Sequence, residues 1–273
     1  MNWVPLLFIN DVCHQLNKRR FSQVSQLSGS WSTVGSKHGE KRRELKFQCK
    51  VNRSQEVSYN LWEIYSHNLT VADLNLEFDR ITSFAWASAR PNDHRVSLRK
   101  LEEKVLPTIA SLVTNCAWWA QKRIFFKAFK NCPGFSEIDL QKQGEESRDF
   151  LARQVELGNV QTLKLSGTGR WPEEENLVET LKIFVSSARF HVLYSHDPLR
   201  DHYELFELFL GRALANELKP GARIIAPSTH LVKIQLLALS PEFSSTKGVW
   251  RIRDSNLRIA LFHLEGLLCL QVE

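Results

Sequence analysis

The sequence is poor in several features that define large classes of protein. Its 273 residues include twelve glycines and nine prolines, too few for a collagen-like chain or one dominated by flexible linkers. No stretch reaches the ~20 apolar residues that a membrane span requires. Even 257–272 is interrupted by Arg258, His263 and Glu265. We therefore expect no transmembrane segment.

Cysteine is also sparse. The five cysteines are odd in number and form no C-x-x-C pair, so neither a zinc module nor a disulfide scaffold is indicated. The first nine residues lack a basic region, and their apolar run stops at Asp11, which does not favour a signal peptide. These absences predict an intracellular protein, cytoplasmic or nuclear, whose cysteines stay reduced.

No catalytic motif is found. The sequence has no phosphate-binding P-loop, no G-x-S-x-G and no H-E-x-x-H, and 167–169 lacks the third glycine of a dinucleotide fingerprint. His191, His196 and His202 are spaced by five and six residues, which does not place two imidazoles on one helix face. We therefore predict no enzyme activity, no cofactor and no metal site.

What is present is a globular composition with one strongly charged segment. Hydrophobic residues make up 43% and charged residues 24% of the chain, and the formal net charge is +6. Segment 18–53 holds ten basic and two acidic residues, whereas the remainder is slightly acidic. This segment is either a nucleic-acid footprint or a solvated helical face. Because no aromatic stacking pattern interleaves with its basic residues, the sequence favours the solvated face.

The N-terminal pattern is helical and then changes to strand. Apolar spacing predicts helices over 4–16 and 21–27 and a third short helix from Trp31 that Gly35 and Gly39 interrupt. Strict alternation over 45–51 predicts a half-buried strand. We therefore expect a helical module at 1–44 and a larger α/β region at 45–273.

The larger region shows a weak repeat of strand and helix. Strands are predicted to begin at Phe135, Val160 and Phe190, each followed by a helical pattern, and 71–76 is a further candidate. The region 96–130 also has room for a unit, but its strand is not identifiable. We expect the three strands to be parallel neighbours with their helices on one face, in an irregular arrangement resembling a leucine-rich-repeat solenoid. An ordinary open α/β sheet is the alternative. Strands are also predicted at 249–253, 257–262 and 267–272, where they cap the sheet.

The N-terminal spacing resembles that of the F-box, a module of three helices. The residues that carry the resemblance are an apolar–proline pair, a series of apolar positions and a final tryptophan: Val4, Pro5, Phe8, Val12, Leu16, Phe21, Val24, Leu27 and Trp31. The amino-acid sequence of this segment is similar to that of the divergent F-box-like proteins greatly expanded in roundworms. The F-L-x-R-Q segment at 150–154, with Trp171-Pro172 further on, is similar to their C-terminal region.

This resemblance implies a non-catalytic subunit of a cullin–RING ubiquitin ligase. The helices would dock on a Skp-type adaptor, and the repeat region would hold an unknown protein substrate. The positions expected to serve binding, directly or by shaping the module, are Val4, Pro5, Phe8, Ile9, Val12, Leu16 and Trp31. Of these, Phe8 and Trp31 are expected in the core of the module, and Val4, Pro5 and Ile9 are expected to meet the adaptor.

Overall fold

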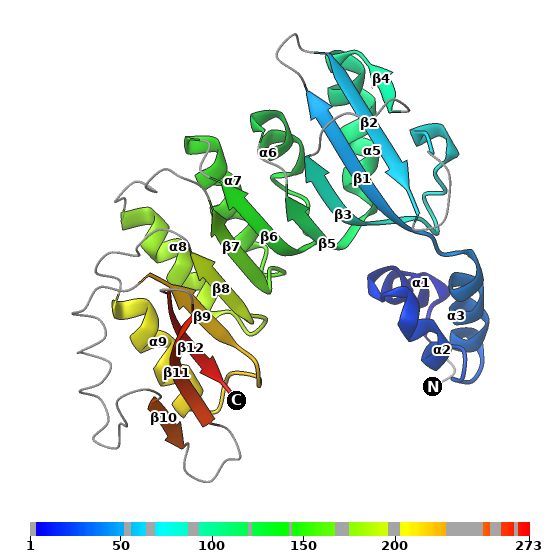
Figure 1. Cartoon of the computed structure of the whole chain (residues 1–273). Coiled ribbons are helices and arrows are strands. Elements are labelled where there is room, and N and C mark those ends of the chain that lie inside the picture. The colour runs from blue at the N-terminus through cyan, green and yellow to red at the C-terminus, as the bar shows by residue number, and fades with distance from the viewer. Residues whose placement is uncertain are drawn as a thin grey trace. The chain divides into compact units, whose positions relative to one another are not determined.

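The computed structural model has a mixed α/β architecture (Figure 1). It describes residues 4–51, 56–63, 69–86, 93–119, 122–141, 144–166, 175–195, 203–227, 248–251, 258–264 and 267–273. Contacts group the chain into two compact units, one of residues 1–120 with 132–135 and one of residues 121–131 with 136–273. We describe each unit by itself.

The first unit begins with a helical module, which we define as residues 4–42. It comprises α1 (Leu6–Gln15), the 3-10 turn η1 (Lys18–Arg20), α2 (Phe21–Val24) and α3 (Ser30–Lys41). Pro5 precedes α1 at the position where its missing N–H costs no hydrogen bond. The predicted helices are present, although α2 is shorter than expected because the chain turns after Val24.

Gly35 and Gly39 do not interrupt α3, contrary to the sequence-based expectation. The helix continues through both glycines, and both lie where α3 packs closely against α2. A Cβ atom on Gly35 would lie 2.6 Å from Cγ1 of Val24 and 3.1 Å from the backbone nitrogen of Ser25. The lack of a side chain at Gly35 therefore allows α3 to lie directly against α2.

The sheet of the first unit has the strand order β5-β3-β1-β2-β4. These strands are β1 (Glu44–Val51), β2 (Val57–Trp62), β3 (Arg80–Trp86), β4 (His94–Val96) and β5 (Val113–Trp119). β1, β3 and β5 are parallel, whereas β2 and β4 are antiparallel to their neighbours. β1 has the predicted alternation, with Leu45, Phe47 and Cys49 buried.

The predicted strand at 71–76 is wrong. Val71–Asp73 forms the 3-10 turn η2, closed by reciprocal hydrogen bonds between Thr70 and Asp73, and Leu76 is 60% exposed. The strand of this region is β3, a few residues later. Between β4 and β5 lie α4 (Leu98–Lys100), the π-helical turn η3 (Leu101–Val105) and α5 (Leu106–Leu112). β5 is therefore the strand of region 96–130 that the periodicity does not reveal.

The core of this sheet is aromatic. Phe47 of β1 stacks on Phe84 of β3, with 5.1 Å between ring centroids, and Phe84 stacks on Trp118 of β5 at 4.8 Å. Trp118 is fully buried in this core, whereas its neighbour Trp119 is 41% exposed.

The helical module is joined to this sheet within one unit. Within the module, the guanidinium group of Arg42 donates to the backbone oxygens of Leu16 (2.6 Å) and Cys13 (2.9 Å). Between the module and the sheet, the backbone N–H of Lys18 donates to Oε1 of Glu44 in β1 at 2.7 Å. The side-chain amide of Asn115 in β5 donates to the backbone oxygen of Gln15 at 2.9 Å. These contacts link sequence-distant segments, so the module and this sheet fall in one compact unit. The division into domains at residue 45 stays a prediction.

The second unit alternates helices and strands. Its helices are α6 (Arg123–Phe129), α7 (Glu145–Glu156), α8 (Glu175–Ser186) and α9 (Tyr203–Leu214). Its strands are β6 (Phe135–Gln141), β7 (Thr162–Ser166), β8 (Val192–Ser195), β9 (Arg223–Ala226), β10 (Gly248–Arg251), β11 (Arg258–Leu264) and β12 (Leu267–Val272).

The predicted pairing of the three central strands is confirmed. β6 is parallel to β7, and β7 is parallel to β8. Figure 1 shows α7, α8 and α9 in a row along one face of these strands, and each contacts the next. Apolar side chains from both layers form the core between them, namely Ile138, Leu163, Leu193, Phe150, Leu181 and Phe206.

The predicted C-terminal strands are also present. β12 pairs antiparallel with β9, β11 with β12, and β10 with β11, so they extend the sheet beyond β9. Within the described segments, every helix is too short or too polar to cross a membrane. All five cysteines are buried free thiols.

Candidate functional site

The helical module has its own apolar core. Ile9, Cys13, Phe21, Val24 and Val34 are buried, and Val4, Leu16 and Trp31 pack against them while partly buried. Residues four apart on a helix share one face, so Ile9 and Cys13 present a single ridge to α2 and α3. The core holds the three helices together and determines which other side chains face solvent.

Two of the predicted roles within the module are wrong. Ile9 is 1% exposed and belongs to the core, so it does not meet a partner in this conformation. Phe8 is 53% exposed rather than in the core, and its ring meets that of Trp31 edge-on, with 6.4 Å between centroids. The helical rotation of 100° per residue explains the exchange, because the two neighbours cannot both face α2 and α3.

The remaining predicted positions lie between these extremes. Pro5 is exposed, whereas Val4, Val12, Leu16 and Trp31 are partly buried. All seven positions therefore lie on one module, but they do not form one surface. Ile9 shapes the module from inside, whereas Pro5 and Phe8 are accessible to another molecule.

Three further leucines of the module are exposed, and none of them was among the positions expected to bind. Leu6 is 59%, Leu7 76% and Leu27 51% exposed. Together with Phe8 they are the large apolar side chains that the module exposes, and we use the name apolar surface for Leu6, Leu7, Phe8 and Leu27 collectively. The signal available in the sequence was that 6–9 are four consecutive apolar residues, more than one helix face can bury. Exposed large apolar side chains mark interaction sites where they form a contiguous patch, and four of them on one small module make it a candidate.

The interior of the module also contains histidines in an unusual environment. His38 is fully buried, stacks on Phe21 at 5.5 Å between centroids and has its Nε2 3.3 Å from Oδ1 of Asn10. Burial, followed by the nearby Arg42 guanidinium, lowers the pKa of His38 to about 4. Burial likewise lowers the pKa of His14, whose ring lies 5.3 Å from that of His38. Both imidazoles are therefore neutral at physiological pH.

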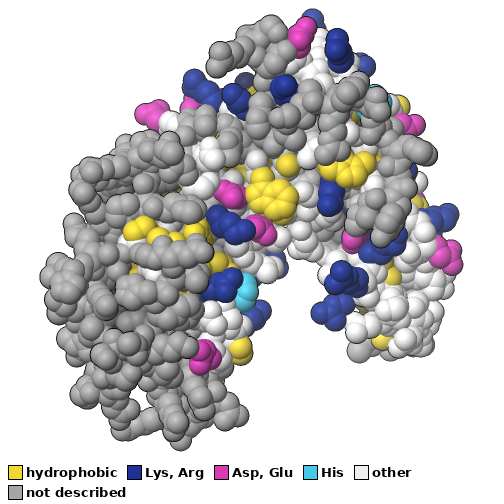
Figure 2. All heavy atoms as spheres, viewed as in Figure 1, with side chains coloured by type: hydrophobic (Ala, Val, Ile, Leu, Met, Phe, Trp, Pro, Cys, Tyr) yellow, Lys and Arg dark blue, Asp and Glu magenta, His cyan; other side chains and the backbone are white. Residues whose placement is uncertain are grey.

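A second surface lies in the other unit, on the face of β6–β8 that the helices leave uncovered. Figure 2 shows basic and acidic side chains intermixed on this face. Lys164 Nζ lies 2.5 Å from Glu137 Oε1, and the Ser166 hydroxyl donates to Asp139 Oδ1 at 2.7 Å. These pairs join neighbouring parallel strands and leave the face polar and mixed in charge. We call it the helix-free face.

No protein-family model matches the chain, and no curated protein matches it significantly. Among the described residues, no three His, Cys, Asp or Glu side chains are grouped as metal ligands would be. His196, His202 and the Trp171-Pro172 pair lie outside the described residues.

Proposed function

We propose that this protein is a substrate-recognition subunit of an SCF-type cullin–RING ubiquitin ligase, and that its helical module docks on a Skp-type adaptor. The observation that carries the proposal is the apolar surface, where Leu7 is the most exposed large apolar residue on a module of F-box-like spacing. An amphipathic helix with one face in its own core and apolar side chains on another suits docking in a partner groove. The protein itself performs no catalysis.

The exposed members of the surface are the proposed contacts. Leu6, Leu7 and Phe8 begin α1, and Pro5 sets the direction in which the chain enters it. Ile9, Cys13 and Leu16 serve binding indirectly, because they hold α1 against the other two helices. Trp31 supports the ring of Phe8 from α3.

The second unit would hold the target protein. Its row of parallel strands with helices on one side supports the irregular leucine-rich-repeat-like interpretation. The helix-free face offers paired charges and hydroxyl groups rather than a catalytic cluster. Mixed polar surfaces of this kind suit recognition of another protein. The five free thiols are consistent with a cytoplasmic or nuclear location.

The docking proposal is tested by substitution of Leu7 with Glu. Leu7 is 76% exposed and does not belong to the core, so L7E is expected to fold normally. The same variant is expected to lose binding to the adaptor in a pull-down. Removal of a central anchor residue typically weakens the binding free energy of an interface by ~2 kcal/mol or more. The matched control is L214E, which places the same charge on a half-exposed leucine at the end of α9. Binding that survives in L7E would reject this surface, and no binding by the unmodified protein would reject the ligase proposal.

A second candidate, nucleic-acid binding, is favoured by the basic segment 18–53. Lys18, Arg19 and Arg20 are exposed on η1. Salt titration separates the two functions, because affinity for phosphates falls by orders of magnitude between low and physiological salt. Docking through apolar side chains would change little over the same range.

A further inference from the structure

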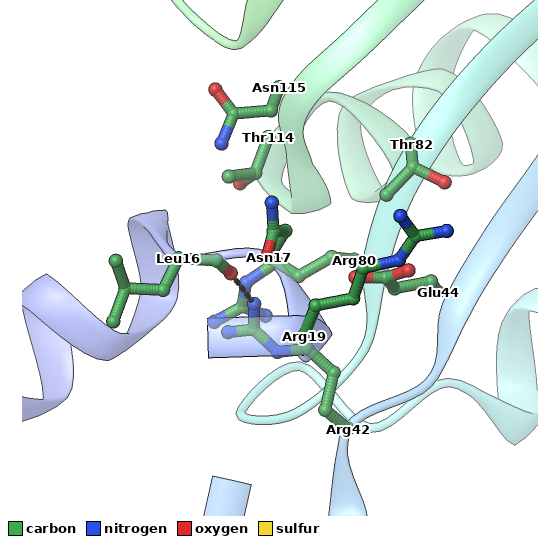
Figure 3. Close-up of a pocket in the computed structure, with 9 residues that line it drawn as sticks. All are labelled: Leu16, Asn17, Arg19, Arg42, Glu44, Arg80, Thr82, Thr114 and Asn115. Atoms are coloured by element: carbon green, nitrogen blue, oxygen red, sulfur yellow. Dashed lines mark hydrogen bonds between the residues drawn. The ribbon is translucent and has the colours of Figure 1, made fainter. Parts of the chain in front are cut away.

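A cavity of about 310 Å³ lies in the first unit at the beginning of the parallel strands (Figure 3). Arg42 and Glu44 line it at the start of β1, Arg80 and Thr82 line it from β3, and Thr114 and Asn115 line it from β5. The segment that follows α1, including Arg19, closes another side. Ligands of open α/β sheets usually bind at the carboxyl ends of the strands. This cavity is at the opposite end, where the helical module meets the sheet.

Irregular strand pairing shapes the cavity. Leu45 and Lys46 of β1 pair with Ile81 and Ser83 of β3, so Thr82 is an extra residue in β3. Between β3 and β5 the register shifts again, and Asn115 adopts a positive φ of 47°. β-Bulges turn side chains out of a regular ladder and are frequent beside functional sites. Here the irregular residues of both strands line the cavity.

Positive charge dominates the lining. Three arginines, Arg19, Arg42 and Arg80, line the cavity together with a single carboxylate residue, Glu44. The nearby buried carboxylate of Asp79 is already bound by Arg43, which donates to both of its oxygens at 2.7 Å and 2.5 Å. Among the described residues, no ion pair joins Arg19, Arg42 or Arg80 to a carboxylate.

Two of these arginines are buried, which is costly for charges that form no ion pair, although the carboxylates of Glu44 and Asp79 favour the charged forms of Arg42 and Arg80, respectively. Arg42 is 2% and Arg80 is 4% exposed, and burial lowers the pKa of both guanidinium groups. Backbone oxygens satisfy several of their N–H groups, those of Leu16 and Cys13 for Arg42 and that of Glu77 for Arg80 (3.0 Å). Nε of Arg42, however, is buried without a hydrogen-bond partner. Neutral backbone oxygens do not supply the missing negative charge.

We propose that this cavity binds a phosphate dianion, either free or as the phosphomonoester of a small molecule. Three guanidinium groups and one carboxylate leave an excess of two positive charges. A phosphate dianion offsets both charges, whereas a ligand with a single carboxylate would offset only one. Guanidinium groups bind phosphate oxygens through charge-assisted hydrogen bonds, and Thr82, Thr114 and Asn115 add polar side chains to the lining. The volume suits a small ligand, at the lower end of the range of about 300–1,000 Å³ for such pockets.

The test is titration of the full chain with inorganic phosphate and, separately, with glycerol phosphate at constant ionic strength. Calorimetry and the shift in Tm are measured together. Both should show saturable binding and stabilisation of the folded chain. Tighter binding of glycerol phosphate identifies an ester as the ligand, and tighter binding of inorganic phosphate identifies the free ion.

Adjacent arginines provide a matched pair of variants. Arg19 lines the cavity and is exposed, so R19A is expected to fold and to weaken phosphate binding about tenfold or more. Arg20 is the next residue, carries the same charge and is equally on the surface, but it donates to Gln23 outside the cavity. R20A should change the dissociation constant by less than twofold.

Three outcomes would overturn the proposal. One is the absence of saturable phosphate binding, and another is equal weakening in R19A and R20A. The third is preferential binding of a short single-stranded DNA that both variants weaken alike and that salt abolishes, because that pattern indicates the basic segment as a whole. None of these outcomes depends on whether the apolar surface docks on an adaptor.

Discussion

Individual buried polar residues carry unusual free-energy costs in this protein. Arg42, Asp79 and His38 are each at most 2% exposed, and each is held differently. Asp79 has a bidentate partner in Arg43, Arg42 has backbone oxygens, and His38 lies among aromatic rings. A buried polar side chain is stable only if its hydrogen bonds are made or its charge is absent. His38 is stable in the interior because its imidazole is uncharged.

The neutrality of His38 predicts sensitivity to acid. Its pKa is about 4 in the folded chain and about 6.5 when exposed, so the unfolded state binds the proton first. The contribution of His38 to the free energy of unfolding should therefore be fully present well above pH 6.5 and fall by up to about 3 kcal/mol as the pH is lowered to 4. Urea unfolding at a series of pH values measures this slope.

His38→Phe should reduce that slope, because Phe keeps a ring against Phe21 and removes the titrating group. His14, whose pKa is lowered in the same direction, should leave a smaller slope of the same sign. An H38F chain with the slope of the unmodified protein would contradict the assignment.

The effect of a glycine on helix packing in this chain depends on whether the glycine faces a neighbouring helix. Gly35 lies in the interior of α3 against Val24, whereas Gly211 lies in the interior of α9 with no atom within 4 Å of its added Cβ position. The same residue type therefore has opposite effects in two helices. In α3 it permits contact, and in α9 it lowers helix propensity without any packing benefit.

The two glycines make a matched pair for mutation. Gly35→Ala should destabilise the chain by about 1–3 kcal/mol, because the new methyl group overlaps Cγ1 of Val24 and the α2 backbone must move. Gly211→Ala should stabilise it by about 0.5–1 kcal/mol through helix propensity. Urea midpoints for the two variants should move in opposite directions. Movement in the same direction would show that space around Gly35 is not the limiting factor.

The organisation into two compact units predicts that damage stays local. Leu270 in β12 is fully buried and pairs with Ile224 of β9, so L270A should cost about 2–5 kcal/mol. The loss should appear in the second unit, since stability is not uniform across a structure with separate cores. Native-state hydrogen exchange should show faster exchange in β7, β8 and β9 and unchanged protection in α1, α3 and β1. Uniform loss of protection would show that the two units unfold as one.

Local sequence patterns predicted the elements that depend on local or repeated burial. The alternation of β1 and the strand–helix order from β6 to α9 are correct, because a half-buried strand or helix requires apolar residues at its own period. β5 was not predicted because a shift in register interrupts its pairing with β3, so its apolar residues do not alternate regularly along the sequence. The strand is instead buried through the stacking of Trp118 on Phe84 of β3. The 71–76 segment was misread because apolar spacing alone does not distinguish a strand from a turn.

Which side chains are available for function was decided by tertiary packing. The spacing from Pro5 to Trp31 indicated a helical module, but the contact of α1 with α2 and α3 determined that Ile9 is buried and Leu7 exposed. The basic segment 18–53 contains Arg19 and Arg42, but nothing in the sequence indicated that they line a cavity with Arg80. Arg19, Arg42 and Arg80 are brought together from η1, the end of α3 and β3, and Asn115 joins them from β5. Residues so far apart meet through long-range contacts, which no local period encodes.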